Sequence, residues 1–218
     1  MLTINTLVLP SPEQWEIIID GMRNPMNSWE KSDSRCYGYD FDIGDADLNL
    51  MRRLSSAGTD HAKFRRMIPV FITITAPLYW WKEFDTYKVG TTANSCSTMH
   101  KIHTKEFTLD DFSIDDYTEI YLANVVADCE TLRRKYLETN DKRYWRGLIQ
   151  LLPSSYNQRR TVALNYEVLT NIYRSRRNHK LTEWHTLCDA IKNLPYSEII
   201  TGEASTNPCT TSSKSNPA

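Results

Sequence analysis

Two groups of side chains in this sequence have the chemistry to bind an anion. Ser97 and Thr98 close a hydroxyl-rich segment, residues 90–98, which is typical of a flexible loop or of a turn whose donors bind an anion. Arg176 lies 79 residues beyond Ser97 and carries a planar fork of donors that can form two parallel hydrogen bonds to a phosphate. We therefore expect Ser97, Thr98 and Arg176 to contact a phosphate-bearing ligand.

Covalent and metal chemistry are not indicated. Cys96 stands beside Ser97, but no neighbouring base would activate its thiol, so a small buried thiol is the favoured interpretation. The chain has 5 cysteines, an odd number with no close pairs, which argues against a disulfide framework and a cysteine-rich zinc site. We assign no catalytic nucleophile and no metal ligand, and we expect reduced thiols.

Charge is unevenly distributed along the chain. The formal net charge is −1, yet residues 130–180 hold twelve Lys or Arg against four Asp or Glu, so this segment is +8 and the remainder is −9. A cationic segment can be a solvated surface, a nucleic-acid-binding face or a pocket for anionic small molecules. Composition does not choose among these three.

The sequence shows no signal for export or membrane insertion. Its N-terminus lacks a basic start and a long apolar run. Residues 68–81, the most apolar stretch, are interrupted by threonines and prolines and fall short of the roughly 18 to 20 residues of a membrane span. We therefore expect a cytoplasmic protein with no membrane partner.

The spacing of apolar residues predicts strands and helices in alternation. Strands are expected at residues 2–9, 68–75 and 161–164, and residues 30–44 are interpreted as a loop. Helices are expected at residues 12–23, 47–54, 77–85, 115–138, 142–151, 166–177 and 182–194. This pattern predicts a helix-rich α+β fold with residues 1–201 in a single domain. Residues 202–218, poor in apolar side chains, cannot offset their ordering entropy and are predicted to be a disordered tail.

The first two helices carry local signals for their ends and buried faces. Ser11, Pro12 and Gln14 suit the N-cap, first and third positions of a helix. Its buried stripe is expected to consist of Trp15, Ile18, Ile19 and Met22. The buried face of the second helix is expected to consist of Leu48, Met51 and Leu54.

Three stretches, in order along the chain, resemble the flavin-dependent thymidylate synthases. The first is Asp60-His61 followed by a strand that ends in Ala76-Pro77, with His61 sixteen residues before Pro77 as in the family. The resemblance implies that His61 helps to hold flavin or folate.

The second stretch is similar to the family's signature, an Arg-His-Arg triplet followed after seven residues by a serine. Counting back from Ser97, the triplet is replaced by Tyr87-Lys88-Val89, so Lys88 is its one remaining cation. Asn94-Ser95-Cys96-Ser97 is similar to the family's Asn-Glu-x-Ser. Glu83 lies close to the position where relatives carry a glutamine that contacts the pyrimidine.

The third stretch starts at Leu152-Pro153 and is the most similar. Asn165 follows Pro153 by twelve residues, and Asn171, Arg176 and His179 come at the family's intervals. The resemblance implies that the two asparagines face the flavin and that Arg176 holds the nucleotide. Eleven residues are about three helical turns, so Asn165 and Arg176 are expected on one side of a helix, roughly 16 Å apart.

The resemblance implies a central sheet flanked by long helices and the synthesis of dTMP from dUMP with methylenetetrahydrofolate, NADPH and reduced FAD. The altered triplet leaves open a related C5 modification of a pyrimidine deoxynucleotide. The substrate is expected to contact Glu83, Ser97, Thr98 and Arg176. The cofactor is expected to contact His61, Lys88, Asn94, Asn165, Asn171 and His179. A homotetramer is also implied, and nucleic acid is not an expected partner of the enzyme.

A second class of function also fits the sequence. A non-catalytic descendant of the same fold could bind a nucleotide or a nucleic acid through the basic segment from Arg133 to Lys180. Flavin absorbance in the isolated protein would favour the enzyme. A colourless protein with salt-dependent DNA affinity would favour the binding module.

Overall fold

The structure is a computed structural model that describes residues 1–203. Most of the predicted tail, residues 204–218, lies outside the described residues. The described chain forms two compact units. Unit 1 comprises residues 1–7, 72–88 and 92–162, and unit 2 comprises residues 8–71, 89–91 and 163–203. The single domain expected over residues 1–201 stays a prediction.

A four-stranded sheet has the strand order β1-β4-β6-β5. Its strands are β1 (Thr3–Val8), β4 (Pro69–Pro77), β5 (Thr92–Ser95) and β6 (Asn157–Asn165). In the inner pair, the hydroxyls of Thr73 and Thr161 are hydrogen-bonded at 2.9 Å. The strands predicted at residues 2–9 and 68–75 are confirmed, and the one predicted at residues 161–164 is part of the longer β6.

The edge strand β5 corrects the interpretation of residues 90–98 as a loop or turn. All four residues of β5 are exposed, so no alternation of apolar and polar side chains marks this strand in the sequence. Strands with neither face buried leave no such pattern. Only pairing within the sheet identifies β5.

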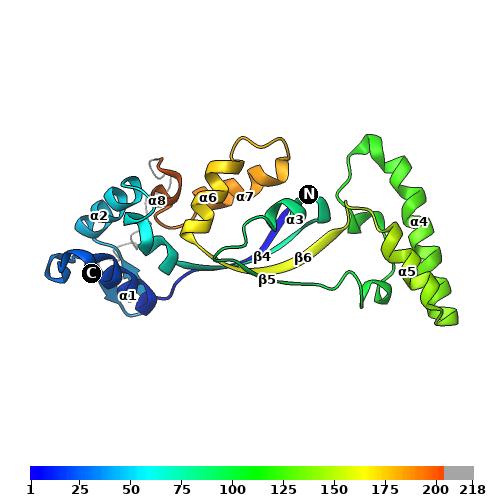
Figure 1. Ribbon diagram of the computed structural model, residues 1–218, viewed down its shortest axis with the longest axis horizontal. Helices are drawn as coiled ribbons and strands as arrows, with labels where there is room; N and C mark the ends of the chain where they lie inside the picture. The colour runs from blue at the N-terminus through cyan, green and yellow to red at the C-terminus, as the bar shows by residue number, and fades with distance from the viewer. Residues whose placement is uncertain (204–218) are drawn as a thin grey trace, which may run out of the picture. The chain divides into compact units, whose positions relative to one another are not determined.

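The helices predicted in unit 1 are confirmed to within one residue at each end. They are α3 (Leu78–Phe84), α4 (Asp116–Thr139) and α5 (Lys142–Leu151), with 3₁₀ turns η4 (Ile102–Thr104) and η5 (Leu109–Asp111). α4 and α5 lie side by side (Figure 1). Asn140 ends α4 in the left-handed conformation, and Asp141 caps α5 by accepting from the amide of Arg143 at 2.8 Å. Their shared core includes Ile102, Phe107, Phe112, Val126, Cys129 and Leu148.

Glu130 is the main ionic contact of α4. Its carboxylate accepts two hydrogen bonds from Arg133 at 2.7 Å, one from Arg134 at 2.9 Å and one from the amide of Phe107 at 3.2 Å. These donors, Arg133 foremost, lower the pKa of Glu130 to about 2 although burial opposes the shift. The carboxylate is therefore ionised over most of the acidic range.

Glu130 should stabilise the fold at neutral pH and lose this contribution in acid. A carboxyl group with a lower pKa in the folded state contributes stability above its unfolded pKa, here 4.5, and loses it as pH falls towards about 2. The difference in melting temperature between wild type and Glu130→Gln is expected to shrink across that window. Glu138→Gln, exposed on the same helix, is the control. A difference that stays constant across that window would contradict the assignment.

Unit 2 is mostly helical. Its elements are α1 (Pro12–Arg23), η1 (Asn24–Met26), η2 (Trp29–Lys31), α2 (Asp45–Ser56), η3 (His61–Met67), α6 (Tyr166–Arg176), α7 (Thr182–Lys192) and α8 (Glu198–Thr201). The capping box between Ser11 and Gln14 is confirmed. The buried stripe of α1, Trp15, Ile18, Ile19 and Met22, is confirmed as well.

Two expectations in unit 2 are corrected. Residues 30–44 contain a hairpin of β2 (Arg35–Tyr37) and β3 (Asp40–Asp42), paired antiparallel. Its turn depends on Gly38 at φ +61°, a conformation that favours glycine. The most buried residues of α2 are Asp47, Leu50 and Met51, whereas Leu48 and Leu54 are half-buried. Apolar spacing alone missed this face because a carboxylate occupies one of its positions.

Asp47 is the centre of a buried polar network in unit 2. Its carboxylate accepts from Arg23 Nε at 2.6 Å, from the hydroxyls of Ser32 and Ser34 at 2.7 and 2.6 Å, and from two loop amides. Burial raises the pKa of Asp47, but the bonds from Ser34, Ser32 and Arg23 together lower it below its usual value. This network connects the loop that precedes α2 with helix α1.

Among residues 1–203, no helix is both long and apolar enough to span a membrane. The cysteines described in the structure, Cys36, Cys96, Cys129 and Cys188, are free thiols. Burial raises the pKa of Cys129 and of Cys188 to about 11. Both buried thiols are therefore poor nucleophiles at neutral pH.

Candidate functional site

The end of α6 and the start of α7 position the arginine expected to bind nucleotide. The guanidinium of Arg176 lies over the ring of Trp184, 4.6 Å from its centroid. Trp184 is completely buried, so it offers a fixed face on which the guanidinium is stacked. Arg176 itself is half-buried. This packing presets the plane of its donors before any ligand binds.

His179 belongs to the turn between these helices. Its Nδ1 accepts from the amide of Leu181 at 3.1 Å, and its ring packs edge-on to Trp184 at 6.2 Å. The backbone oxygen of His179 accepts from Nε2 of His185 at 2.7 Å. His179 and Arg176 therefore contact the same indole ring.

Asn165 lies one position outside α6, as its N-cap. Its Oδ1 accepts from the amide of Val168 at 3.1 Å, and its backbone is extended. The sequence predicted that Asn165 and Arg176 are both residues of one helix. This is wrong for Asn165, which precedes the first helical residue, Tyr166. Gly90 approaches from the segment 89–91 at φ +74°, where a Cβ would lie 3.2 Å from Nδ2 of Asn165. Beside it, Oγ1 of Thr91 is buried without a hydrogen-bond partner in residues 1–203.

Two further predicted cofactor residues are on the surface of unit 2. His61 is exposed as the first residue of η3, and its amide donates to the backbone oxygen of Gly58. Asn171 is exposed on α6. Neither His61 nor Asn171 takes part in the contact between Arg176 and Trp184.

In unit 1, Ser97 organises a turn directly after β5. Its Oγ accepts from the amides of His100 at 2.8 Å and Met99 at 3.3 Å. The indole of Trp145 on α5 donates to the Met99 oxygen at 2.9 Å. The hydroxyl proton of Ser97 remains able to donate to a ligand, because both bonds use its oxygen as acceptor.

The neighbours of Ser97 on β5 and in the turn differ in exposure. Thr98 is half-buried and Asn94 is exposed. Cys96 is exposed as well, so the favoured interpretation of a buried thiol is wrong. Its backbone is nevertheless fixed, since its amide donates to Arg159 and its oxygen accepts from Gln158 Nε2 at 2.6 Å.

The segment Tyr87-Lys88-Val89, which stands in place of the signature triplet, follows α3. Glu83 and Tyr87 are half-buried, Lys88 is exposed, and Val89 is 92% exposed. Tyr87 packs against Phe84 with ring centroids 6.3 Å apart. Lys88 and Val89 fall on either side of the boundary between the units.

Arg160 on β6 is a candidate that sequence reasoning missed. Its guanidinium lies 4.4 Å from the ring of Trp81, its Nη1 pairs with Asp85 at 2.8 Å, and its Nε donates to Gln158. The contact joins β6 to the end of α3. Arg160 and Asp85 are 75 residues apart in the sequence. Only the adjacent basic pair Arg159-Arg160 signalled it in the sequence.

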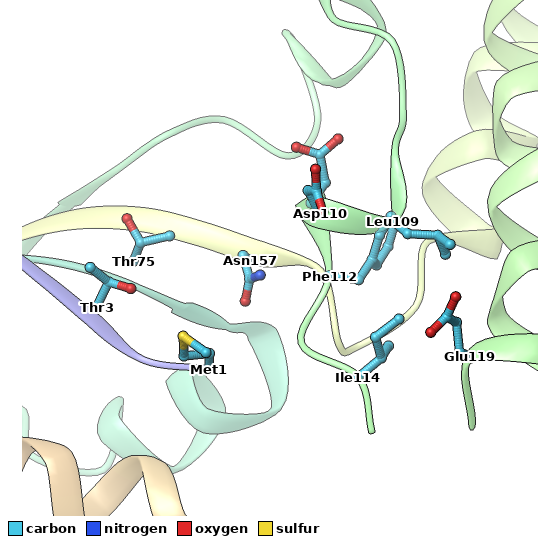
Figure 2. Close-up of a pocket in the computed structure, with 10 residues that line it drawn as sticks. Met1, Thr3, Thr75, Leu109, Asp110, Phe112, Ile114, Glu119 and Asn157 are labelled. Carbon is cyan, nitrogen blue, oxygen red and sulfur yellow. The ribbon is translucent and has the colours of Figure 1, made fainter. Parts of the chain in front are cut away.

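Unit 1 also contains a cavity of about 710 Å³. The strand residues Thr3 and Thr75 lie across it from Ile114 and Glu119 (Figure 2). Asp110 and Asp111 add carboxylates to the lining, and no residue predicted to bind substrate or cofactor lines this cavity.

Ser97 belongs to unit 1 and Arg176 to unit 2, so the anion site that would join them stays a prediction. Within residues 1–203, no group of three or more His, Cys, Asp or Glu side chains could hold a metal ion.

The chain has an α+β fold like that of the flavin-dependent thymidylate synthases. One such structure is the flavin-dependent thymidylate synthase ThyX from Helicobacter pylori complexed with FAD and dUMP, with a TM-score of 0.69 and 19% identity over 94% of this chain and 98% of that chain. A second structure of Helicobacter pylori ThyX with FAD and dUMP has a TM-score of 0.68 and 18% identity over 92% and 95%. The sequence matches no family model and no curated protein.

Proposed function

We propose that this protein is a flavin-dependent thymidylate synthase-like enzyme. It converts dUMP to dTMP, or makes a related C5 modification of a pyrimidine deoxynucleotide, with methylenetetrahydrofolate, NADPH and reduced FAD. The likeness of fold over 94% of the chain to a ThyX crystallised with FAD and dUMP carries this proposal. A cytoplasmic location and a homotetramer are parts of the same proposal.

Polar groups in unit 2 fit the requirements of a flavin nucleotide. The buried hydroxyl of Thr91 lacks a partner among the described residues, and the amide of Asn165 adjoins the same segment. Such donors can bind the carbonyl groups of a flavin ring. Asn171, His61 and His179 would add contacts to the cofactor, and in unit 1 Lys88 and Asn94 would do so.

FAD, when bound, supplies the hydride-transfer chemistry of the reaction. The side chains of this chain would bind and orient the substrate. Arg176, preset by Trp184, and the hydroxyl of Ser97 would bind the phosphate, while Glu83 and Thr98 would contact the rest of the nucleotide. Fixed donors of this kind raise the rate by holding reactants in a productive geometry.

A non-catalytic nucleotide-binding protein is the second candidate. The replacement of the signature triplet by Tyr87-Lys88-Val89 favours it, since two of the three positions carry no charge and Val89 is exposed to solvent. This candidate predicts nucleotide binding without flavin.

Titration with FAD distinguishes the two candidates. Flavin fluorescence is expected to be quenched on binding, with micromolar or tighter affinity. Asn165→Ser keeps an N-cap acceptor but removes the amide donor, and should weaken FAD binding by roughly two- to tenfold, the value of one hydrogen bond. Lys63→Ala, exposed on η3, is the control and should bind as wild type does. Absence of quenching with a folded wild-type protein would remove the flavoenzyme and leave the binding protein.

A further inference from the structure

A pocket in unit 2 is lined by none of the residues assigned to nucleotide or flavin. Its volume is about 350 Å³, at the lower end of the roughly 300 to 1,000 Å³ typical of small-molecule sites. α2, η3, α6 and α8 all contribute to its walls. Its charged and hydroxyl-bearing lining residues are Arg52, Ser55, Ser56, Arg65, Arg174, Glu198 and Glu203.

Two of the residues that line this pocket, Arg65 and Ser55, each have a buried donor atom without a partner in residues 1–203. Arg65 is 2% exposed. Its Nη2 pairs with Glu167 at 2.7 Å and its Nη1 donates to the Ile199 oxygen at 3.1 Å. Its Nε and the Oγ of Ser55 are buried with no hydrogen-bond partner in the described part of the chain. A buried donor without a partner destabilises the fold, so an acceptor that reaches these atoms is favoured.

A second guanidinium adds charge to the same pocket. Arg174 is exposed on α6 and makes no hydrogen bond or ion pair with residues 1–203. Burial lowers the pKa of Arg65, and the charge of Arg174 lowers it further, whereas Glu167 raises it. Two cations that repel each other beside a cavity are stabilised by an anion bound between them.

Glu198 supplies the opposite chemistry. Its Oε1 pairs with Arg52 at 2.8 Å, while its Oε2 is buried without a partner among the described residues. A buried carboxylate oxygen requires a donor, and a ligand hydroxyl would serve. Ile199 and Ile200 form an apolar wall.

We propose that this pocket binds a small phosphate monoester that also carries a hydroxyl group. Arg65, Arg174 and Ser55 bind the phosphate oxygens, and Glu198 accepts from the hydroxyl. The several oxygens of a phosphate match two guanidinium groups and a serine better than the two oxygens of a carboxylate do.

Calorimetric titration of the full chain at constant ionic strength tests the proposal. The probes are glycerol 3-phosphate, inorganic phosphate, acetate and glycerol, with FAD and dUMP absent. Glycerol 3-phosphate should bind more tightly than inorganic phosphate, and both more tightly than acetate; glycerol should not bind. Arg65 is left intact because its loss would leave Glu167 as an unpaired buried charge.

Four variants locate the site. Arg174→Gln should weaken binding of both phosphates at least tenfold, and Ser55→Ala by roughly ten- to 150-fold, as expected for hydrogen bonds to a charged group. Arg53→Gln removes a neighbouring exposed charge on α2 and should change nothing. Equal losses of phosphate affinity in Arg174→Gln and Arg53→Gln would show only a general attraction between charges and would contradict the proposed site. If only Arg176→Ala loses phosphate affinity, the phosphate binds outside this pocket. If acetate binds as tightly as phosphate, the pocket does not select a phosphate monoester.

Discussion

Asp47→Asn is expected to lower the free energy of unfolding by about 3 to 5 kcal/mol, the usual cost of removing one partner of a buried ion pair. The Arg23 and Asp47 side chains are 4% and 0% exposed. An amide keeps the shape of the carboxylate but leaves the Arg23 guanidinium buried without its counter-charge. It also replaces one accepting oxygen by an NH₂ group, which faces the surrounding hydrogen-bond donors. Urea denaturation followed by tryptophan fluorescence measures the loss.

Two further variants separate the ion pair from other effects. Asp45→Asn, in the same first turn of α2 but exposed, removes only a favourable charge at the helix start, about 0.3 to 1 kcal/mol. Arg23→Gln should be costly alone and nearly neutral when added to Asp47→Asn, because the charge left unpaired is then gone. Additive losses in the double variant would show that the two residues act independently.

Local signals predicted the elements whose ends and faces are encoded by neighbouring residues. α1 was predictable because Ser11, Pro12 and Gln14 act within a single turn and its apolar residues follow one stripe. α4 and α5 were predictable from length and periodicity. β5 and the β2–β3 hairpin were not, because their residues are mostly exposed and only pairing with another strand defines them.

The polar sites were harder to predict because their partners are distant in sequence. Arg176 could be chosen from its residue type and its position in the third stretch, but its stacking on Trp184 depends on the turn between α6 and α7. The pocket formed by Arg65, Arg174 and Ser55 joins segments more than 100 residues apart. No spacing rule connects such residues, so side-chain chemistry identified candidates and the fold showed which of them meet.

Arg176→Ala is expected to weaken dUMP binding by about 2 to 4 kcal/mol, or roughly 30- to 700-fold. Arg176 is the only cation among the residues expected to contact the substrate, Glu83, Ser97, Thr98 and Arg176, so its loss should be costly. Arg176→Lys retains the charge but loses the planar fork and the stacking on Trp184, and should give an intermediate loss. Arg177→Ala removes the adjacent, exposed guanidinium, which pairs with Glu203 at 3.4 Å, and should bind dUMP as wild type does.

Ser97→Ala should cost about 1 to 2 kcal/mol of dUMP binding. It removes one hydroxyl donor and also the acceptor for the amides of Met99 and His100, so the turn should loosen as well. Calorimetry with dUMP, dCMP and dTMP on wild type, Arg176→Ala, Arg176→Lys, Arg177→Ala and Ser97→Ala measures these effects. If Arg176→Ala and Ser97→Ala bind as wild type does, the phosphate site lies elsewhere. If wild type binds none of the three nucleotides, the substitution of Tyr87-Lys88-Val89 for the signature triplet has changed the ligand.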